Sequence, residues 1–149
     1  MGNVFRIMAM VYAFLFENSN SVSAFLSGLI SGIVILQSFV IAPTVFNVFS
    51  ETEARAFLRS IFPKFFLCIG FFSLTSLCFS LITKLEGWIT VLGTFSLAAA
   101  TTSYLLVPTL NRFRDNDETI MFKILHTFIV ILTLTILIGN SLVVFALNE

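Results

Sequence analysis

The sequence predicts an all-α membrane protein, a four-transmembrane-helix bundle made of two parallel helix-hairpin repeats. Of its 149 residues, 58% are apolar and only 11% are charged, a composition unlike that of soluble domains. The mean hydropathy of +1.03 agrees with this. The charges are bunched, which leaves four uncharged stretches longer than the roughly 18 residues that indicate a membrane span. These stretches are residues 18–50, 65–83, 87–111 and 124–148.

Helices are favoured over a β-barrel because the stretches are continuously apolar and do not alternate. The expected transmembrane helices lie near residues 24–46, 64–83, 88–108 and 122–146. They occupy nearly the whole chain, so residues 1–149 are expected to form a single integral membrane domain. The lipid bilayer is therefore the expected partner, and no nucleic acid is expected.

The N-terminal segment, residues 1–21, precedes the first predicted span. Its apolar part, Val4–Phe16, is too short to cross a bilayer. A signal peptide is one alternative, although no small-residue cleavage site clearly follows. A true start at Met8 or Met10 is another. The pattern favours a short helix lying in the membrane interface.

Cationic residues indicate the orientation of the spans. Six of them flank the loops between spans 1 and 2 and between spans 3 and 4: Arg55, Arg59, Lys64, Arg112, Arg114 and Lys123. Only Arg6 and Lys84 lie on the other side. The positive-inside rule then predicts both loops in the cytoplasm and both termini outside.

A shift of 65 residues aligns two parts of the chain. It places Ser38–Thr44 on Ser103–Thr109, and both segments end in Pro-Thr. The same shift superimposes Gly28 on Gly93, Phe57 on Phe122, and the cap-like Ser50-x-x-Glu53 on Asp115-x-x-Glu118. The alignment predicts a duplicated helix hairpin, with the two copies related by a pseudo-twofold axis along the membrane normal.

The segment Ser50–Ile61 is predicted to form a separate amphipathic helix on the cytoplasmic surface, ending before Pro63. Its start matches a capping box, and Glu51 can pair with Arg55 one turn later. In the first span, small residues four apart mark a face for close approach of another backbone. We expect this face to cross helix 88–108, or to form the surface of a homodimer. The predicted helix-packing residues are Gly28, Gly32, Gln37 and Asn140.

Residues that could bind a ligand gather at the predicted cytoplasmic end. Pro43 and Pro108 remove backbone donors near the ends of equivalent helices, and would either kink these helices around a cavity or, as is favoured, end them. The side chains that could bind an anionic group there are Arg55, Arg59, Asn111, Arg112, Arg114 and His126. Topogenic charge and an interfacial hydrogen-bonded histidine are the simpler interpretations.

No catalytic residues, metal site or cofactor are predicted. The sequence contains no GxGxxG, P-loop, HExxH or Ser/His/Asp arrangement, so we expect no enzyme activity. A haem with two histidine ligands cannot be built within one chain because His126 is the only histidine. Away from their ends, the predicted spans contain no Asp, Glu, Lys or Arg, which argues against a carboxylate proton relay.

Four short motifs resemble a known family: Gly32 with Phe39–Phe46, Phe62-Pro63, Pro108-x-x-Asn111-Arg112, and Phe122-x-x-x-His126. Over residues 25–147 the chain resembles the bacterial domain-of-unknown-function membrane family related to transmembrane protein 205. An Ala-Gly pair recurs in that family after the first helix, whereas here Ala54 is followed by Arg55. The eukaryotic relatives are associated with platinum-drug resistance, so the resemblance implies export or trafficking.

Two functions are expected from these observations. The first is binding or movement of a small molecule, lipid or metal complex near the cytoplasmic face. The alternative is a non-catalytic accessory or assembly subunit, whose 19 phenylalanines supply faces that pack in a larger membrane complex.

Overall fold

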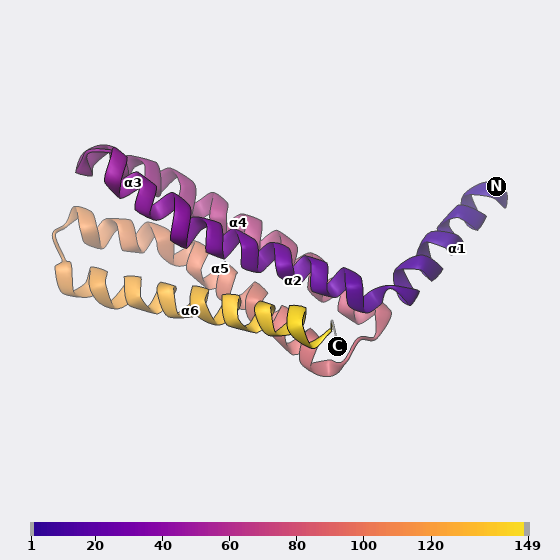
Figure 1. Ribbon diagram of the computed structural model, residues 1–149. Coiled ribbons are helices and arrows are strands. Elements are labelled where there is room, and N and C mark those ends of the chain that lie inside the picture. The colour runs from indigo at the N-terminus through magenta and orange to yellow at the C-terminus, as the bar shows by residue number, and fades with distance from the viewer. Residues whose placement is uncertain (1, 148–149) are drawn as a thin grey trace.

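The computed structural model describes residues 2–147, which are almost entirely helical (Figure 1). Its elements are α1 (Gly2–Glu17), α2 (Ser19–Ile35), the π-helix η1 (Leu36–Ile41), α3 (Ala42–Val48), α4 (Glu51–Thr83), α5 (Gly87–Asp115) and α6 (Thr119–Ala146). The predicted domain extends to Met1 and to residues 148–149, which lie outside the described residues.

Four helical stretches are long and apolar enough to cross a membrane: Ser19–Val48, α4, α5 and α6. The chain is therefore a multi-pass integral membrane protein, and the predicted four-helix membrane fold is confirmed. At 1.5 Å per residue, α4 is about 50 Å long, whereas the hydrocarbon core of a bilayer is about 30 Å thick. Part of α4 therefore extends past the hydrocarbon core.

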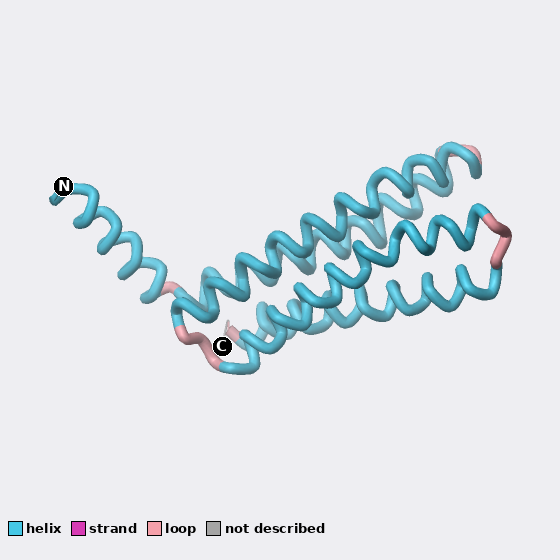
Figure 2. Tube along the Cα trace, turned by 180° about the vertical axis from the view of Figure 1, so that it is seen from behind, coloured by secondary structure: helices cyan, strands magenta, loops and turns pink. Residues whose placement is uncertain are grey.

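The four spans form a ring in which α2 packs against α4 and α6, and α5 packs against the same two helices. Figure 2 shows the short connections that make consecutive spans antiparallel neighbours. Helices α2 and α5 consequently lie diagonally opposite each other. The expected crossing of the first and third spans is wrong. Short loops make consecutive helices neighbours, so helices two apart along the chain lie diagonally opposite each other.

The centre of the bundle is small and tightly packed. Each span contributes an apolar side chain that is 0% exposed: Ile30, Ile69, Ala100 and Ile136. The predicted packing residue Asn140 is buried on α6, and its Nδ2 donates to Ser96 Oγ of α5 at 3.0 Å. A polar contact therefore fixes α6 against α5 inside the apolar core.

The two predicted packing glycines of α2 lie in different environments. A Cβ atom added at Gly28 would meet Val144 Cγ2 of α6 at 3.8 Å, so this position takes part in the bundle. Gly32 is exposed, and a Cβ atom there would meet nothing within 4 Å. Of these two glycines, only Gly28 therefore lies where another helix of the same chain approaches.

Helix α4 runs without a break from Glu51 through Pro63, so the predicted separate surface helix is wrong. Its start agrees with the sequence: the backbone N–H of Ser50 donates to Glu53 Oε2 at 3.0 Å, and the capping box is complete. A proline removes one helical hydrogen bond, but ending the helix would expose several more backbone groups. Continuing the helix costs less beside a membrane.

Pro43 and Pro108 do not end their helices, so the favoured prediction of termination is also wrong. Helix α5 continues past Pro108 to Asp115. Upstream of Pro43 the backbone forms η1, in which the N–H of Ala42 donates to the carbonyl oxygen of Gln37, five residues earlier. The ring of Pro43 would clash with the carbonyl of Phe39 in a regular helix, and the wider turn moves this carbonyl away.

Helix α1 extends away from the bundle at an angle (Figure 1). Its side chains are exposed around almost its whole circumference, and it contacts α2 near the junction at Asn18. The expected short N-terminal helix is confirmed, whereas its location in the membrane interface stays a prediction. The loops 49–50 and 116–118 lie at the opposite end of the bundle, called the loop end below.

Candidate functional site

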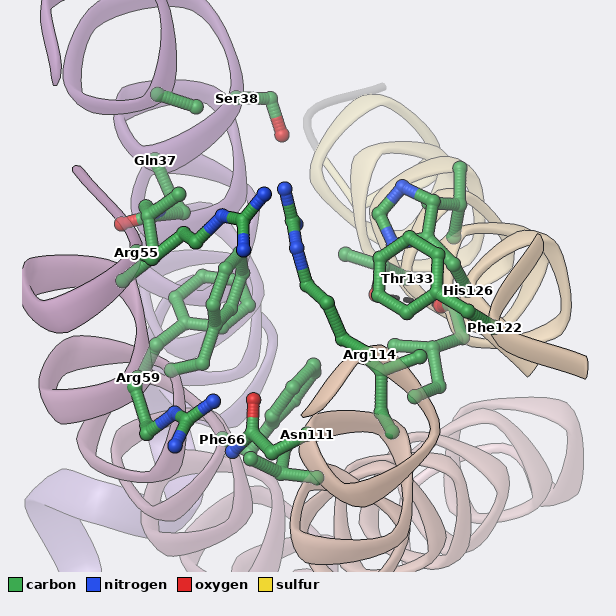
Figure 3. Close-up of a pocket in the computed structure, with 18 of the residues that line it drawn as sticks. Gln37, Ser38, Arg55, Arg59, Phe66, Asn111, Arg114, Phe122, His126 and Thr133 are labelled. Atoms are coloured by element: carbon green, nitrogen blue, oxygen red, sulfur yellow. Dashed lines mark hydrogen bonds between the residues drawn. The ribbon is translucent and has the colours of Figure 1, made fainter. Parts of the chain in front are cut away.

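A cavity of about 400 Å³ opens between the helices at the loop end. Its walls come from η1, α3, α4, α5 and α6, so all four spans contribute. Figure 3 shows the polar side chains that surround it: Gln37, Ser38, Arg55, Arg59, Asn111, Arg114, His126 and Thr133. The remaining wall is mostly apolar, and the volume falls within the range of small-molecule sites.

The apolar part of the wall is built around a phenylalanine cluster on α4. The ring centroids of Phe65 and Phe66 lie 5.0 Å apart in an edge-on arrangement, and Phe62 stacks on Phe66 at 6.3 Å. Phe65 and Phe66 are buried in the core, so the cluster is held rigidly. These aromatic rings provide a dry surface against which hydrocarbon can pack.

Two arginines on α4 are paired with carboxylates. Arg55 pairs with Glu51 one turn earlier, as predicted. Arg59 Nη2 lies 2.6 Å from Asp115 Oδ1, and this ion pair joins α4 to the end of α5. Asp115 therefore ends α5 and does not cap α6, which corrects the predicted equivalence with Ser50. Both ion pairs are partly exposed and contribute little to stability.

Arg114 is the arginine of the cavity without a carboxylate partner among residues 2–147. Its Cζ lies 5.0 Å from the ring centroid of Phe122, on α6. Phe122 in turn stacks on His126, with the centroids 5.7 Å apart and the rings inclined by 6°. In Figure 3 the guanidinium of Arg114 extends into the middle of the cavity. Its donors are therefore available to an anion.

Gln37 lies in the cavity wall, and its predicted role in helix packing stays a prediction. Its side chain is only 5% exposed, and its amide nitrogen Nε2 has no hydrogen-bond partner among the described residues. The sequence signal for this position was Pro43, because the π-turn that relieves the proline clash includes residue 37.

The predicted ligand-binding residues divide into two groups. Those that line the cavity are Arg55, Arg59, Asn111, Arg114 and His126. Arg112, Pro43 and Pro108 are exposed and lie outside the lining. The side chain of Arg112 lies over Phe113, with Cζ 5.9 Å from the ring centroid. Helix periodicity separates Arg112 from Arg114, since residues two apart face different sides.

Sequence reasoning missed several lining residues, notably Phe122, Thr133 and Ser38. Phe122 was recognised only as part of a motif, and nothing in its neighbourhood indicated that it would support Arg114. Among residues 2–147, no three His, Cys, Asp or Glu side chains lie close enough together to hold a metal ion. The site thus combines an apolar wall, one arginine without a carboxylate partner and one buried amide.

Residues 25–118, more than half of the chain, match the family described as Domain of unknown function (DUF4149). The matched range includes η1, the cavity residues of α4 and those of α5, and it ends before His126. No curated protein and no solved structure matches the chain. By the length of the match, this chain belongs to the DUF4149 family.

Proposed function

We propose that the chain binds a small amphiphilic molecule with an anionic group in the cavity at the loop end. The observation that carries this proposal is Arg114, whose guanidinium lies in an apolar cavity without a carboxylate partner among residues 2–147. A carboxylate or phosphate would receive charge-assisted hydrogen bonds from it. The hydrocarbon part of the same molecule would pack on the phenylalanine cluster of α4.

The balance of charge around the cavity supports an anionic ligand. Arg55 and Arg59 each pair with a carboxylate, Glu51 and Asp115, whereas Arg114 forms no ion pair among the described residues. A guanidinium in contact with an apolar surface is partly desolvated, which strengthens its attraction for an anion. A lipid, a free fatty acid or an anionic metal complex all share this chemistry, and binding any of them is a non-catalytic role.

We also propose that the loop end faces the cytoplasm of a bacterial inner membrane, with both termini outside. The concentration of arginine and lysine at this end supports the orientation. A ligand would then enter from the cytoplasmic leaflet. Accessibility labelling of Asn116→Cys in intact cells tests this, and labelling from the periplasmic side would overturn it.

The proposed duplication agrees with the ring of helices. A twofold axis that exchanges α2 with α5 and α4 with α6 would superimpose the α2–α6 pair on the α5–α4 pair. Both pairs of helices pack against each other. This supports descent from a helix hairpin. The sequence motifs alone support a relation to transmembrane protein 205. From that relation we propose that the protein also moves the bound molecule across the bilayer.

The binding proposal is tested with the protein in phosphatidylcholine nanodiscs and radiolabelled stearic acid. We expect saturable binding that stearylamine, which has the same chain and a cationic head, does not displace. Arg114→Gln should weaken binding about tenfold to a hundredfold, the effect of removing a charged hydrogen-bond donor. Dioleoylphosphatidic acid as a competitor distinguishes a phosphate lipid from a free carboxylate.

Arg112→Gln is the matched control for this experiment, because Arg112 has the same chemistry but is exposed outside the cavity. Its binding should stay within about twofold of the wild type. Equal losses in the two variants, or displacement by stearylamine, would show that only general charge attracts the probe. No saturable binding by the wild-type protein would overturn the proposal.

An accessory role in a larger membrane complex is the second candidate. It is favoured by α1, whose large apolar side chains are exposed and contact little of the bundle, and by the open face at Gly32. A second copy or another membrane protein could cover either surface. Gly32→Leu should then abolish cross-linking to the partner while stearic acid binding stays unchanged. Normal assembly of this variant would exclude the Gly32 face.

A further inference from the structure

We propose that the ligand carries a second polar group, a hydrogen-bond acceptor such as a ketone or ester carbonyl, that binds the side-chain amide of Gln37. This inference rests on the proposed function, because it assigns a second contact within the same cavity. It defines the ligand class as an acidic amphiphile with a carbonyl group partway along its apolar part.

The first support is the state of the Gln37 side chain. It is 5% exposed, and its Nε2 has no hydrogen-bond partner among the described residues. Three buried serine hydroxyls, those of Ser23, Ser73 and Ser103, also lack a partner, but of these four residues only Gln37 lines the cavity. A buried donor without an acceptor costs free energy, and native proteins satisfy nearly all such groups. Asn140, the other buried carboxamide in the described spans, does find partners, in Ser96 and in the carbonyl of Ile136. Among the described residues Gln37 therefore lacks an acceptor. Because Nε2 itself has almost no exposed surface, the amide must turn toward the cavity for a ligand to supply that acceptor.

The second support is the backbone around Gln37. The residue belongs to η1, and π-turns inside α-helices occur frequently at functional sites. Its neighbours Leu36 and Ser38 are exposed while Gln37 is buried, so the turn directs this one polar side chain inward. Gln37 lies on the wall opposite the unpaired guanidinium of Arg114, as seen in Figure 3.

Helix geometry gives the spacing between the two polar contacts. Gln37 lies about three turns inside the end of α3 at Val48. Arg114 lies in the last turn of α5, and Phe122, which its guanidinium covers, lies in the first turn of α6. Three turns rise about 16 Å, and the Arg114 side chain extends several ångströms back into the cavity, so the two ligand groups should be roughly 10 Å apart along the bundle axis. Apolar wall separates them.

A simple fatty acid would make only one of the two polar contacts. Its carboxylate would reach Arg114, but its hydrocarbon chain would lie against Gln37 and leave the amide nitrogen unsatisfied. A carbonyl oxygen placed midway along the chain would accept from Nε2 and remove that cost. The site should therefore bind a ligand without this carbonyl more weakly. Other sites with buried donors likewise reject analogues that lack the matching acceptor.

The test compares stearic acid with a stearic acid that carries one keto group near the middle of its chain, both bound to the protein in phosphatidylcholine nanodiscs. We expect the wild-type protein to bind the mid-chain keto acid about fivefold to tenfold more tightly, the effect of one neutral hydrogen bond. Gln37→Met keeps the length of the side chain and removes the amide, so it should abolish the preference. A keto group at the far end of the chain should give no preference.

Arg114→Gln is the matched comparison, because it should weaken both acids equally and preserve the preference. Binding of both acids with equal affinity by the wild-type protein would overturn the role of Gln37 and leave the proposed function intact. Absence of binding of either acid would overturn the proposed function itself. Because the comparison of the two acids uses the wild-type protein, a folding defect in Gln37→Met does not affect that result.

Discussion

The two segments Ser38–Thr44 and Ser103–Thr109 share a motif but fold differently. Both carry a serine five residues before a Pro-Thr pair. Upstream of Pro43 the backbone widens into η1, whereas α5 passes through Pro108 as a regular helix. The same local sequence signal therefore produced a π-turn in one place and none in the other.

The surroundings of the two segments explain the difference. Ser103 is fully buried and Val107 is 5% exposed, so α5 is confined between α4 and α6 along this stretch. In the first segment the two aligned positions are less buried, since Ser38 is exposed and Ala42 is half-buried. A π-turn needs room for the bulged backbone, and only the first segment has it. A proline therefore favours a π-turn in the residues before it, and the packing around the segment decides whether that turn forms.

The largest expected effect is a difference in stability between leucine substitutions at the two aligned serines, Ser38 and Ser103. Ser103→Leu should lower the free energy of unfolding by about 3 kcal/mol, because a larger side chain overpacks a fully buried site between helices. Ser38→Leu should change it by less than about 0.5 kcal/mol, since the side chain is exposed. Unfolding by sodium dodecyl sulfate in mixed micelles measures both. Equal losses in the two variants would show that the segments are packed alike.

The second prediction removes the cause of the π-turn. Pro43→Ala restores a backbone donor and removes the ring, so the helix should become regular and turn Gln37 away from the cavity. We expect about tenfold weaker binding of the mid-chain keto acid, which would approach the affinity for stearic acid. The control is Pro108→Ala, with at most about a twofold change. Full binding by Pro43→Ala would mean that the cavity forms without the proline.

The smallest expected effect concerns the loops that follow the two segments. Ser50 completes a capping box at the start of α4, whereas the aligned Asp115 ends α5 and pairs with Arg59. Ser50→Ala should lower the free energy of unfolding by about 1 kcal/mol through loss of the cap. Asp115→Ala should have a smaller effect, because it removes only an exposed ion pair. Thermal melting in detergent compares them, and a larger loss for Asp115→Ala would contradict this assignment.

Some of the predicted site residues line the cavity and others do not, for reasons that can be traced to particular positions. Arg55, Arg59 and Arg114 reach the cavity because charged residues near the ends of spans cluster at one end of any bundle. Arg112 lies outside the cavity lining, and this depends on how α5 is rotated in the ring, which the sequence does not indicate. Gln37 was assigned to packing because a polar residue in an apolar span usually finds a partner helix.

By itself the sequence determined the four spans, the helix cap at Ser50, the Glu51–Arg55 pair and the cationic end of the bundle. These features depend on the length of apolar runs and on residues a few positions apart. Only the tertiary structure decided that α4 continues through Pro63, that α2 and α5 are diagonal, and that Gln37 faces a cavity. The physical reason is that the backbone near a proline and the direction of a buried polar side chain both depend on the space between neighbouring helices, which the sequence does not specify.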